Sequence, residues 1–392
     1  MTKKWRTLFF AWILLMSIFF SAMEVRAEEQ SPALSLSAPE YVLMEPETGT
    51  VICEKDKDTK RSPASVTKIM TLLLIFDHME EGSLKLEDTV ITSAYAKSMG
   101  GSQVFLEEGE TQTVETMIKC IVIASGNDAS VAMAEHISGS EAEFVKEMNA
   151  RAQSLGMKNT HFEDCCGLTD SENHYTTAYD IALMSRELIT RYPEILQYSS
   201  IWMDTITHTT RQGTKEFGLS NTNRLIRTYD GCVGLKTGST SKAKFCLSAV
   251  AQRKGITLIA VVMAAPDSKT RVRDTSALLD YGFSRCRLYK DENPGRLPEP
   301  VVKKGIKNRV SLVYQDTFRY LSTDGTDPGT PEKKLSVPRE VQAPVKKGEK
   351  AGELIYEKNG KEIGRIPILY GESIARATYF DCLKQAAREL CI

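Results

Sequence analysis

The chain has 392 residues, of which 42% are hydrophobic and 26% charged, and its formal net charge is −1. This length exceeds that of one average domain, so we expect two globular domains with sizeable cores. The near-neutral charge and the absence of a dense basic stripe argue against a nucleic-acid partner.

The first 27 residues have the pattern of a secretory signal. Three basic residues occur among the first six positions, an apolar run spans 8–20, and Val25-Arg26-Ala27 offers small residues where a signal peptidase reads. The apolar run is short for a membrane span, and an uncleaved N-terminal anchor is the alternative. The pattern predicts an exported, extracytoplasmic protein, either associated with the wall or membrane or periplasmic, whose mature chain begins near Glu28.

The cysteines are numerous for an exported protein of this size. There are nine of them, and an odd number cannot all pair within one chain. Cys120 and Cys246 lie in apolar stretches, which favours small buried thiols over disulfide partners. The composition therefore favours a reducing or anaerobic exterior.

The first half of the chain predicts a hairpin followed by apolar helices. The runs 41–44 and 50–53 are strand-like and are joined by a turn that contains proline and glycine. A helix over 65–76 is apolar nearly all round, so it belongs in a domain centre. A second apolar helix over 114–124 stops at a polar break, and 128–136 continues as helix. We expect the glycine at that break to let the chain turn.

The second half predicts the sheet and a separate β-rich part. A helix is expected over 178–190, and strands over 246–250 and 257–263. Helices between strands indicate a mixed α/β (α+β) domain, a sheet covered by helices, over 28–290. A linker rich in proline and glycine follows, and short strands predict a small all-β domain over 291–370.

The final segment, 371–392, has apolar residues at near-helical spacing with basic residues nearby. This pattern predicts an amphipathic helix. Such a helix could make peripheral contact with the outer face of the cytoplasmic membrane, although docking on the body of the protein is favoured by its modest asymmetry.

Three short polar motifs occur along the chain: Ser65-Val66-Thr67-Lys68, Ser125-Gly126-Asn127 and Lys236-Thr237-Gly238. The first two patterns also occur elsewhere, at Ser239 to Lys242 and at Ser171 to Asn173, as average composition would produce. Only the three motifs named above, and not these other matches, lie where apolar segments begin or end. Such junctions are where a rigid scaffold can direct polar groups into a cleft.

The first two motifs fit nucleophilic catalysis. Ser65 and Lys68 stand one helical turn apart, an arrangement that suits a nucleophile beside its base. The base must spend time neutral, which a second cation close by would favour, and Lys236 is the candidate. Ser125 can relay a proton to a leaving amine, and the Asn127 amide can hold a peptide-like substrate.

The third motif fits the recognition of a carboxylate. Lys236 and Thr237 supply a cation and a hydroxyl, just before a predicted strand. We expect Gly238 to leave room for an extended substrate alongside. The backbone N–H groups of Ser65 and Ser239 are candidates for the oxyanion site.

These residues resemble a known family, the low-molecular-mass penicillin-binding proteins that are serine-type D-Ala-D-Ala carboxypeptidases. The likeness runs from about Tyr41 to Phe283 and includes the Pro63-Ala64 lead into the nucleophile and His174-Tyr175-Thr176-Thr177-Ala178. The β-rich part after the linker is similar, more loosely, to the C-terminal domain of the family.

The resemblance implies a penicillin-binding/β-lactamase-like transpeptidase domain with an antiparallel-type sheet. It implies peptidoglycan stem peptides ending in D-Ala-D-Ala as substrate, covalent inhibition by β-lactam antibiotics, and no cofactor or metal. The catalytic residues it implies are Ser65, Lys68 and Ser125, and the substrate-binding residues are Asn127, Lys236, Thr237, Gly238 and Ser239.

One departure from the family pattern concerns Cys165-Cys166. With His161 and His174 these thiols could hold zinc on ligand types alone. Adjacent ligands chelate poorly, however, and the family pattern already accounts for the surrounding residues. We therefore expect no metal and a structural or cleft-lining role for His174.

Other activities remain as alternatives. A class A β-lactamase shares the first and third motifs, but the Glu-x-x-Leu-Asn segment that would position its water is missing here. A transpeptidase would use the same acyl-enzyme with an amine acceptor. A non-catalytic wall-binding module is disfavoured, because a binder does not need an activated nucleophile.

Overall fold

The computed structural model describes residues 34–383, with the exception of 212, 293 and 382. The predicted signal, 1–27, lies outside the described residues, and so does the end of the predicted tail helix, from 384 onward.

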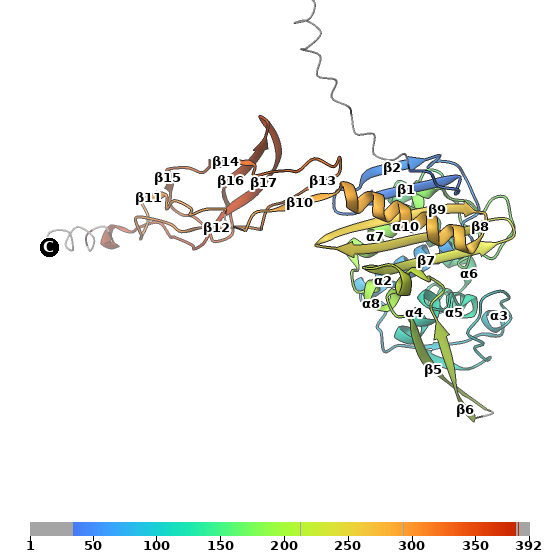
Figure 1. The fold of residues 1–392 in the computed structure, drawn as a ribbon. Helices are drawn as coiled ribbons and strands as arrows, with labels where there is room; N and C mark the ends of the chain where they lie inside the picture. Colours follow the sequence, from blue (N-terminus) through green and yellow to red (C-terminus); the bar gives the residue numbers. More distant parts are fainter. Residues whose placement is uncertain (1–33, 212, 293, 382, 384–392) are drawn as a thin grey trace, which may run out of the picture. The chain divides into compact units, whose positions relative to one another are not determined.

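One five-stranded sheet forms the centre of the first part of the described chain (Figure 1). Its strands lie in the order β2-β1-β9-β8-β7, and every neighbouring pair is antiparallel. The strands are β1 (Glu40–Glu45), β2 (Thr50–Lys55), β7 (Cys232–Thr240), β8 (Lys244–Arg253) and β9 (Ile256–Ala265). The predicted N-terminal hairpin is thus confirmed, as are the two predicted strands of the sheet centre. The third motif precedes the predicted strand β8 as expected, but it lies itself inside an edge strand, β7, that the sequence did not predict.

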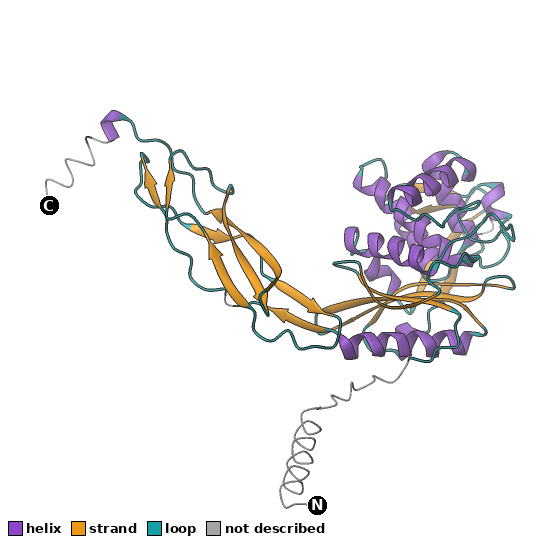
Figure 2. Ribbon diagram, turned by 90° about the horizontal axis from the view of Figure 1, so that it is seen from above, coloured by secondary structure: helices purple, strands orange, loops and turns teal. Residues whose placement is uncertain are grey.

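Helices cover both faces of this sheet (Figure 2). The long helix α10 packs against β8 and β9 on one face, whereas α7 packs against β1 and β9 on the other. The main helices are α2 (Lys68–Glu80), α4 (Val114–Val122), α5 (Asn127–Ser138), α6 (Glu141–Ser154), α7 (Ala178–Arg191) and α10 (Ser268–Arg285). Shorter ones are the 3-10 turn η1 (Ala64–Thr67), α3 (Ala94–Lys97), α8 (Ile195–Ser199) and α9 (Leu225–Thr228).

Side-chain caps explain where several helices begin. The Thr113 hydroxyl accepts the Thr116 N–H before α4, and the Thr177 hydroxyl accepts the Asp180 N–H before α7. Each cap satisfies a backbone donor that the first turn leaves free. The predicted central helix is confirmed, because residues 68–76 of α2 are all buried in the main core.

Two small hairpins flank the helices. They are formed by β3 (Thr89–Ile91) with β4 (Thr111–Thr113), and by β5 (Met203–Thr210) with β6 (Gly213–Ser220). In the second hairpin the strands pair over their whole length, from Met203 opposite Ser220 to Thr210 opposite Gly213.

Residues 287–370 of the described chain form strands without a helix, as predicted. The larger sheet of this part has the order β12-β17-β16-β14, and its buried cluster is drawn from residues 302–374. The predicted Asn359-Gly360 turn is confirmed, since both residues have positive φ and Lys358 pairs with Lys361 across a two-residue loop. The strands are β10 (Arg287–Lys290), β11 (Val301–Lys303), β12 (Leu312–Tyr314), β13 (Arg319–Ser322), β14 (Glu332–Ser336), β15 (Glu340–Gln342), β16 (Lys350–Lys358) and β17 (Lys361–Tyr370).

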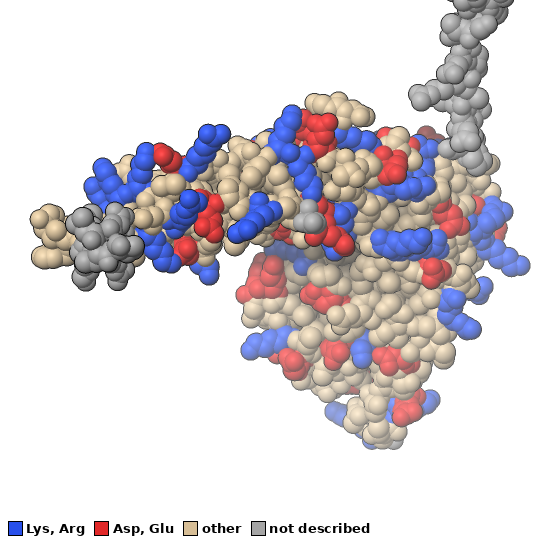
Figure 3. Space-filling model, turned by 60° about the vertical axis from the view of Figure 1, so that its left-hand side comes forward, with Lys and Arg blue, Asp and Glu red and all other residues tan. Residues whose placement is uncertain are grey.

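The surface of the described residues is mixed in charge. On the face shown in Figure 3, lysine and arginine side chains are interspersed with aspartate and glutamate. Among the described residues, no helix has both the length and the apolar character that crossing a membrane requires.

Candidate active site

The turn before α2 carries Ser65 and brings it to Lys68. Ser65 lies in η1, Lys68 is the first residue of α2, and the Lys68 Nζ is 3.0 Å from the Ser65 Oγ. Ala64, just before the serine, has φ +48°, a left-handed conformation that is rare outside glycine. The predicted pair is therefore in hydrogen-bond contact, but the serine precedes the α-helix in a tighter 3-10 turn.

The Lys68 ammonium is fully buried and has three acceptors around it. Besides Ser65, its Nζ donates to the Asn127 Oδ1 at 2.6 Å and to the Cys166 backbone carbonyl at 2.9 Å. These contacts use the three donors of an ammonium group. Burial is the main cause that lowers the pKa of Lys68, while the neighbouring Cys165 and Cys166 thiols and the Asp164 and Asp128 carboxylates act in the opposite direction. Burial, and not the second cation that the sequence suggested, thus lowers the pKa of this lysine.

The second motif joins α4 to α5. Ser125 has φ +63° and is almost fully buried, whereas Gly126 has an ordinary negative φ as the N-cap of α5. Our expectation that the glycine makes the turn is wrong, because the serine itself adopts the left-handed conformation. Asn127 begins α5, and its Nδ2 donates to the Gly100 carbonyl at 2.7 Å. This bond fixes the amide so that its oxygen faces Lys68.

The third motif brings a second lysine to a second serine. The Lys236 Nζ donates to the Ser125 Oγ at 2.9 Å and to the Thr237 carbonyl at 3.1 Å. Burial holds the pKa of Lys236 well below its ordinary value, and the positive charges of Lys68 and Arg271 lower this pKa further. The Thr237 hydroxyl donates to the Thr222 hydroxyl at 2.7 Å. Each catalytic candidate serine thus has its own lysine.

Close packing alone requires a glycine at position 238, and the expected space for an extended substrate alongside it stays a prediction. A Cβ at this position would lie 2.7 Å from the Pro63 carbonyl oxygen and 3.0 Å from the Ser65 backbone nitrogen. Both are backbone atoms, so no side-chain rotation could relieve the contact. The glycine lets β7 pack directly against the turn that carries the nucleophile.

Ser239 lies at the exposed end of β7, where it pairs with Phe245 of β8. It is the next residue after the close contact between β7 and the serine turn. Its role at an oxyanion site stays a prediction.

Sequence reasoning missed some residues that hold the site in place. The Cys166 backbone carbonyl contacts Lys68. Because every residue has such a carbonyl, the residue type at 166 could not predict this contact. The buried Arg271 guanidinium, from α10, donates to the Gly238 carbonyl at 3.4 Å and to the Cys246 carbonyl at 3.3 Å. Arg271 lies over 30 residues beyond the third motif and belongs to no motif, so the sequence did not indicate that it contacts this site.

The two histidines that the sequence suggested as zinc ligands, His161 and His174, form hydrogen bonds with other groups. The His174 Nε2 lies 2.9 Å from the Thr67 hydroxyl and its Nδ1 accepts the Glu163 N–H, so both ring nitrogens have partners beside the serine turn. The His161 Nδ1 lies 2.8 Å from the Asn173 carbonyl. The side chain that joins Cys165 and Cys166 is instead that of Glu141.

The sequence matches two family models. One, described as D-alanyl-D-alanine carboxypeptidase, matches residues 25–267. The chain belongs to the D-alanyl-D-alanine carboxypeptidase family. The other model, described as the C-terminal domain of penicillin-binding protein 5, matches residues 291–376. The family and the fold predicted from the three motifs are confirmed.

Relatives are similar over most of the chain. The chain is 41% identical to D-alanyl-D-alanine carboxypeptidase DacF of Bacillus subtilis, over 95% of each protein. It is 31% identical to DacA of Escherichia coli strain K12, over 88% of this chain and 85% of that one. The solved structure of penicillin-binding protein 5 from Haemophilus influenzae has a TM-score of 0.67 and 30% identity, covering 87% of this chain and 98% of that one.

Proposed function

We propose that Ser65, Lys68 and Ser125 perform acyl transfer in this D-alanyl-D-alanine carboxypeptidase, on peptidoglycan stem peptides that end in D-Ala-D-Ala. One observation carries this proposal: each of two buried lysines lies one hydrogen bond from a different serine, Lys68 from Ser65 and Lys236 from Ser125. Such a pairing supplies a nucleophile with its base and a second hydroxyl that can pass on a proton.

In the acylation step, Lys68 accepts the Ser65 proton while the Ser65 Oγ attacks the carbonyl carbon of the penultimate D-alanine. The backbone N–H groups of Ser65 and Ser239 stabilise the oxyanion. The C–N bond then breaks, and the leaving amine of the terminal D-alanine receives a proton through Ser125. Water hydrolyses the ester and regenerates Ser65. A β-lactam enters the same path and stays attached to Ser65.

Lys236 and Thr237 are the proposed partners of the free carboxylate at the end of the substrate. A charge-assisted hydrogen bond to a carboxylate contributes roughly 1.5–3 kcal/mol. An enzyme that uses one should therefore distinguish a free carboxylate from a blocked one by about 10-fold or more. Asn127 is the proposed partner of the peptide backbone of the acyl part, and its bonds to Lys68 and Gly100 support this role by fixing the orientation of its amide.

The test compares two substrates that differ only at the C-terminus. Release of D-alanine from a peptide ending in D-Ala-D-Ala should exceed release of D-alaninamide from the matching C-terminal amide by about 10-fold or more. Equal turnover of both would contradict the carboxypeptidase assignment and favour an endopeptidase that acts within cross-links.

Transfer to an amine is the second candidate reaction. A streptomyces DD-transpeptidase structure has a TM-score of 0.59 and 29% identity, covering 64% of this chain and 98% of that one. Adding an amino acid acceptor to the same assay separates the two reactions. Free acid as the main product supports the hydrolase, and an acceptor adduct as the main product supports the transferase.

We also propose that the enzyme is exported and works outside the cytoplasm, on the pattern of residues 1–27. Sequencing of the mature N-terminus from expressing cells should place cleavage just after Ala27. A mature protein that retains the basic start of the chain would contradict this proposal.

Peripheral contact with the membrane is proposed for the tail. Tyr379 and Phe380 are 74% and 73% exposed, and Leu383 is 49% exposed, so apolar side chains face solvent at its start. Exposed aromatic and aliphatic groups of this kind insert at a lipid interface. Vesicle sedimentation should capture the mature chain, whereas a chain ending at residue 376 should stay in solution. Equal sedimentation of both would refute a role for the tail.

A further inference from the structure

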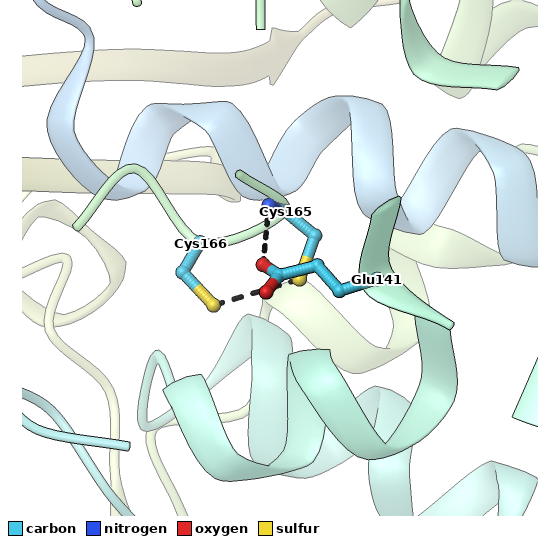
Figure 4. A group of neighbouring side chains, drawn as sticks. All are labelled: Glu141, Cys165 and Cys166. Atoms are coloured by element: carbon cyan, nitrogen blue, oxygen red, sulfur yellow. Dashed lines mark hydrogen bonds between the residues drawn. The ribbon is translucent and has the colours of Figure 1, made fainter. Parts of the chain in front are cut away.

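Two cysteines and a glutamate form a compact group beside the proposed active site, and the proposed reaction does not use their side chains (Figure 4). The Cys165 and Cys166 thiols and the Glu141 carboxylate supply three ligand atoms, all within 4.8 Å of one another. Both cysteines are buried and Glu141 is half-buried. We propose that this group binds a thiophilic divalent cation, of the class of Zn²⁺ or Cd²⁺.

The geometry suits one tetrahedral ion. Two sulfur atoms bound to zinc at about 2.3 Å each would lie roughly 3.8 Å apart. The Cys165 and Cys166 sulfurs are 3.6 Å apart, so the adjacent residues already direct their thiols toward a common point. This observation answers the objection that adjacent cysteines chelate poorly. A carboxylate oxygen is an accepted third ligand, which leaves the fourth position to water.

Surrounding hydrogen bonds hold the carboxylate in place. The Glu141 Oε1 accepts the Cys165 N–H at 3.0 Å, and its Oε2 accepts the Tyr95 hydroxyl at 2.7 Å. Bonds from outside the ligand set orient metal ligands and contribute to affinity. Tyr95 is 50% exposed, so the carboxylate is hydrogen-bonded to a side chain at the surface while the thiols are buried.

The ligands come from two separate segments. Glu141 begins α6, whereas the thiols lie 24 and 25 residues later in the loop whose Cys166 carbonyl contacts Lys68. A bound ion would tie α6 to this loop. On binding, two S–H bonds break, two metal–sulfur bonds form and two protons pass to solvent. The reaction is an exchange of protons for a cation and needs no oxidant.

The test uses the mature chain, reduced and freed of metal with a chelator. Titration with Cd²⁺ should show one bound equivalent, an ultraviolet absorption band from thiolate bound to cadmium, and a melting temperature raised by several degrees. Zn²⁺ should displace the cadmium and remove the band. No band and no rise in melting temperature in the folded chain would overturn the proposal.

Variants separate this group from the other cysteines. Cys165→Ala and Cys166→Ala should lose the band, whereas Cys120→Ala, which removes an equally buried lone thiol, should keep it. Glu141→Gln keeps both thiols and should weaken Cd²⁺ binding at least 10-fold, which tests the site even if a cysteine variant fails to fold. Wild-type affinity in Glu141→Gln, or a band lost equally in Cys120→Ala, would refute it. A mass lower by two hydrogens under reductant, with no cation bound, would show a disulfide instead.

Discussion

Replacing Gly238 with alanine should move the nucleophile without removing any polar side chain. The added Cβ would meet the Pro63 carbonyl oxygen at 2.7 Å, the Val66 nitrogen at 2.9 Å and the Ser65 nitrogen at 3.0 Å. Ordinary contact begins near 3.4 Å. The serine turn and β7 must therefore separate by about 0.7 Å, because all three atoms belong to the backbone.

A displacement of this size is large for catalysis and moderate for stability. A misplacement of about 1 Å can lower a rate by 10²-fold, so we expect acylation by a fluorescent penicillin to slow by about 10- to 100-fold. Overpacking typically costs about 1–3 kcal/mol, which should lower the melting temperature by a few degrees in a protein of this size.

The matched control is Gly218→Ala, in β6, where an added Cβ would have no atom within 4 Å. This variant should acylate like the wild type. A Gly238→Ala enzyme that folds and acylates within two-fold of the wild-type rate would refute the argument that this glycine sets the position of Ser65.

Lys68→Ala should lower the acylation rate at least 10²-fold with little change in substrate affinity; a rise in KM alone would make Lys68 a binding residue. Lys236→Ala should shrink the preference for the free acid over the amide, and an unchanged preference would remove Lys236 from the carboxylate site. The pKa of Lys236 lies below its ordinary value, and only the charged ammonium attracts a carboxylate. The preference for the free acid should therefore fall with rising pH, at a lower pH than the one at which an ordinary lysine loses its proton. A preference that stays constant up to about pH 10 would contradict this prediction. Gly167→Ala should lower the melting temperature of the chain. The φ of residue 167 is +74°, and an added Cβ would lie 1.8 Å from the Ala64 carbonyl oxygen. An unchanged melting temperature would contradict this prediction.

Local patterns predicted several elements of both domains. The central helix was readable because an apolar run of its length must be buried, and the Asn359-Gly360 turn because few residues accept positive φ. The three motifs were readable because their residue types are unusual together. Strand β7 was not predicted, since its motif residues Lys236 and Thr237 are polar although buried in an edge strand.

Contacts between distant segments could not be read in the same way. The left-handed conformation of Ser125, and the Cβ-free approach of Gly238 to Ser65, depend on how two segments meet and not on either segment alone. The same holds for Glu141, which the fold brings to Cys165 and Cys166 in place of the histidines that the sequence offered. The residue types identified the candidate reacting groups, whereas only the packing showed which other residues hold those groups in position.

The intact mass of the mature chain after exposure to a penicillin tests the proposed reaction most directly. One penicillin should add per chain, and peptide mapping should place it on Ser65, because that hydroxyl contacts the buried Lys68. Ser65→Ala should fold and remain unmodified, since it removes one small polar atom. An adduct on Ser125 or Ser239, or no adduct in folded protein, would contradict the account.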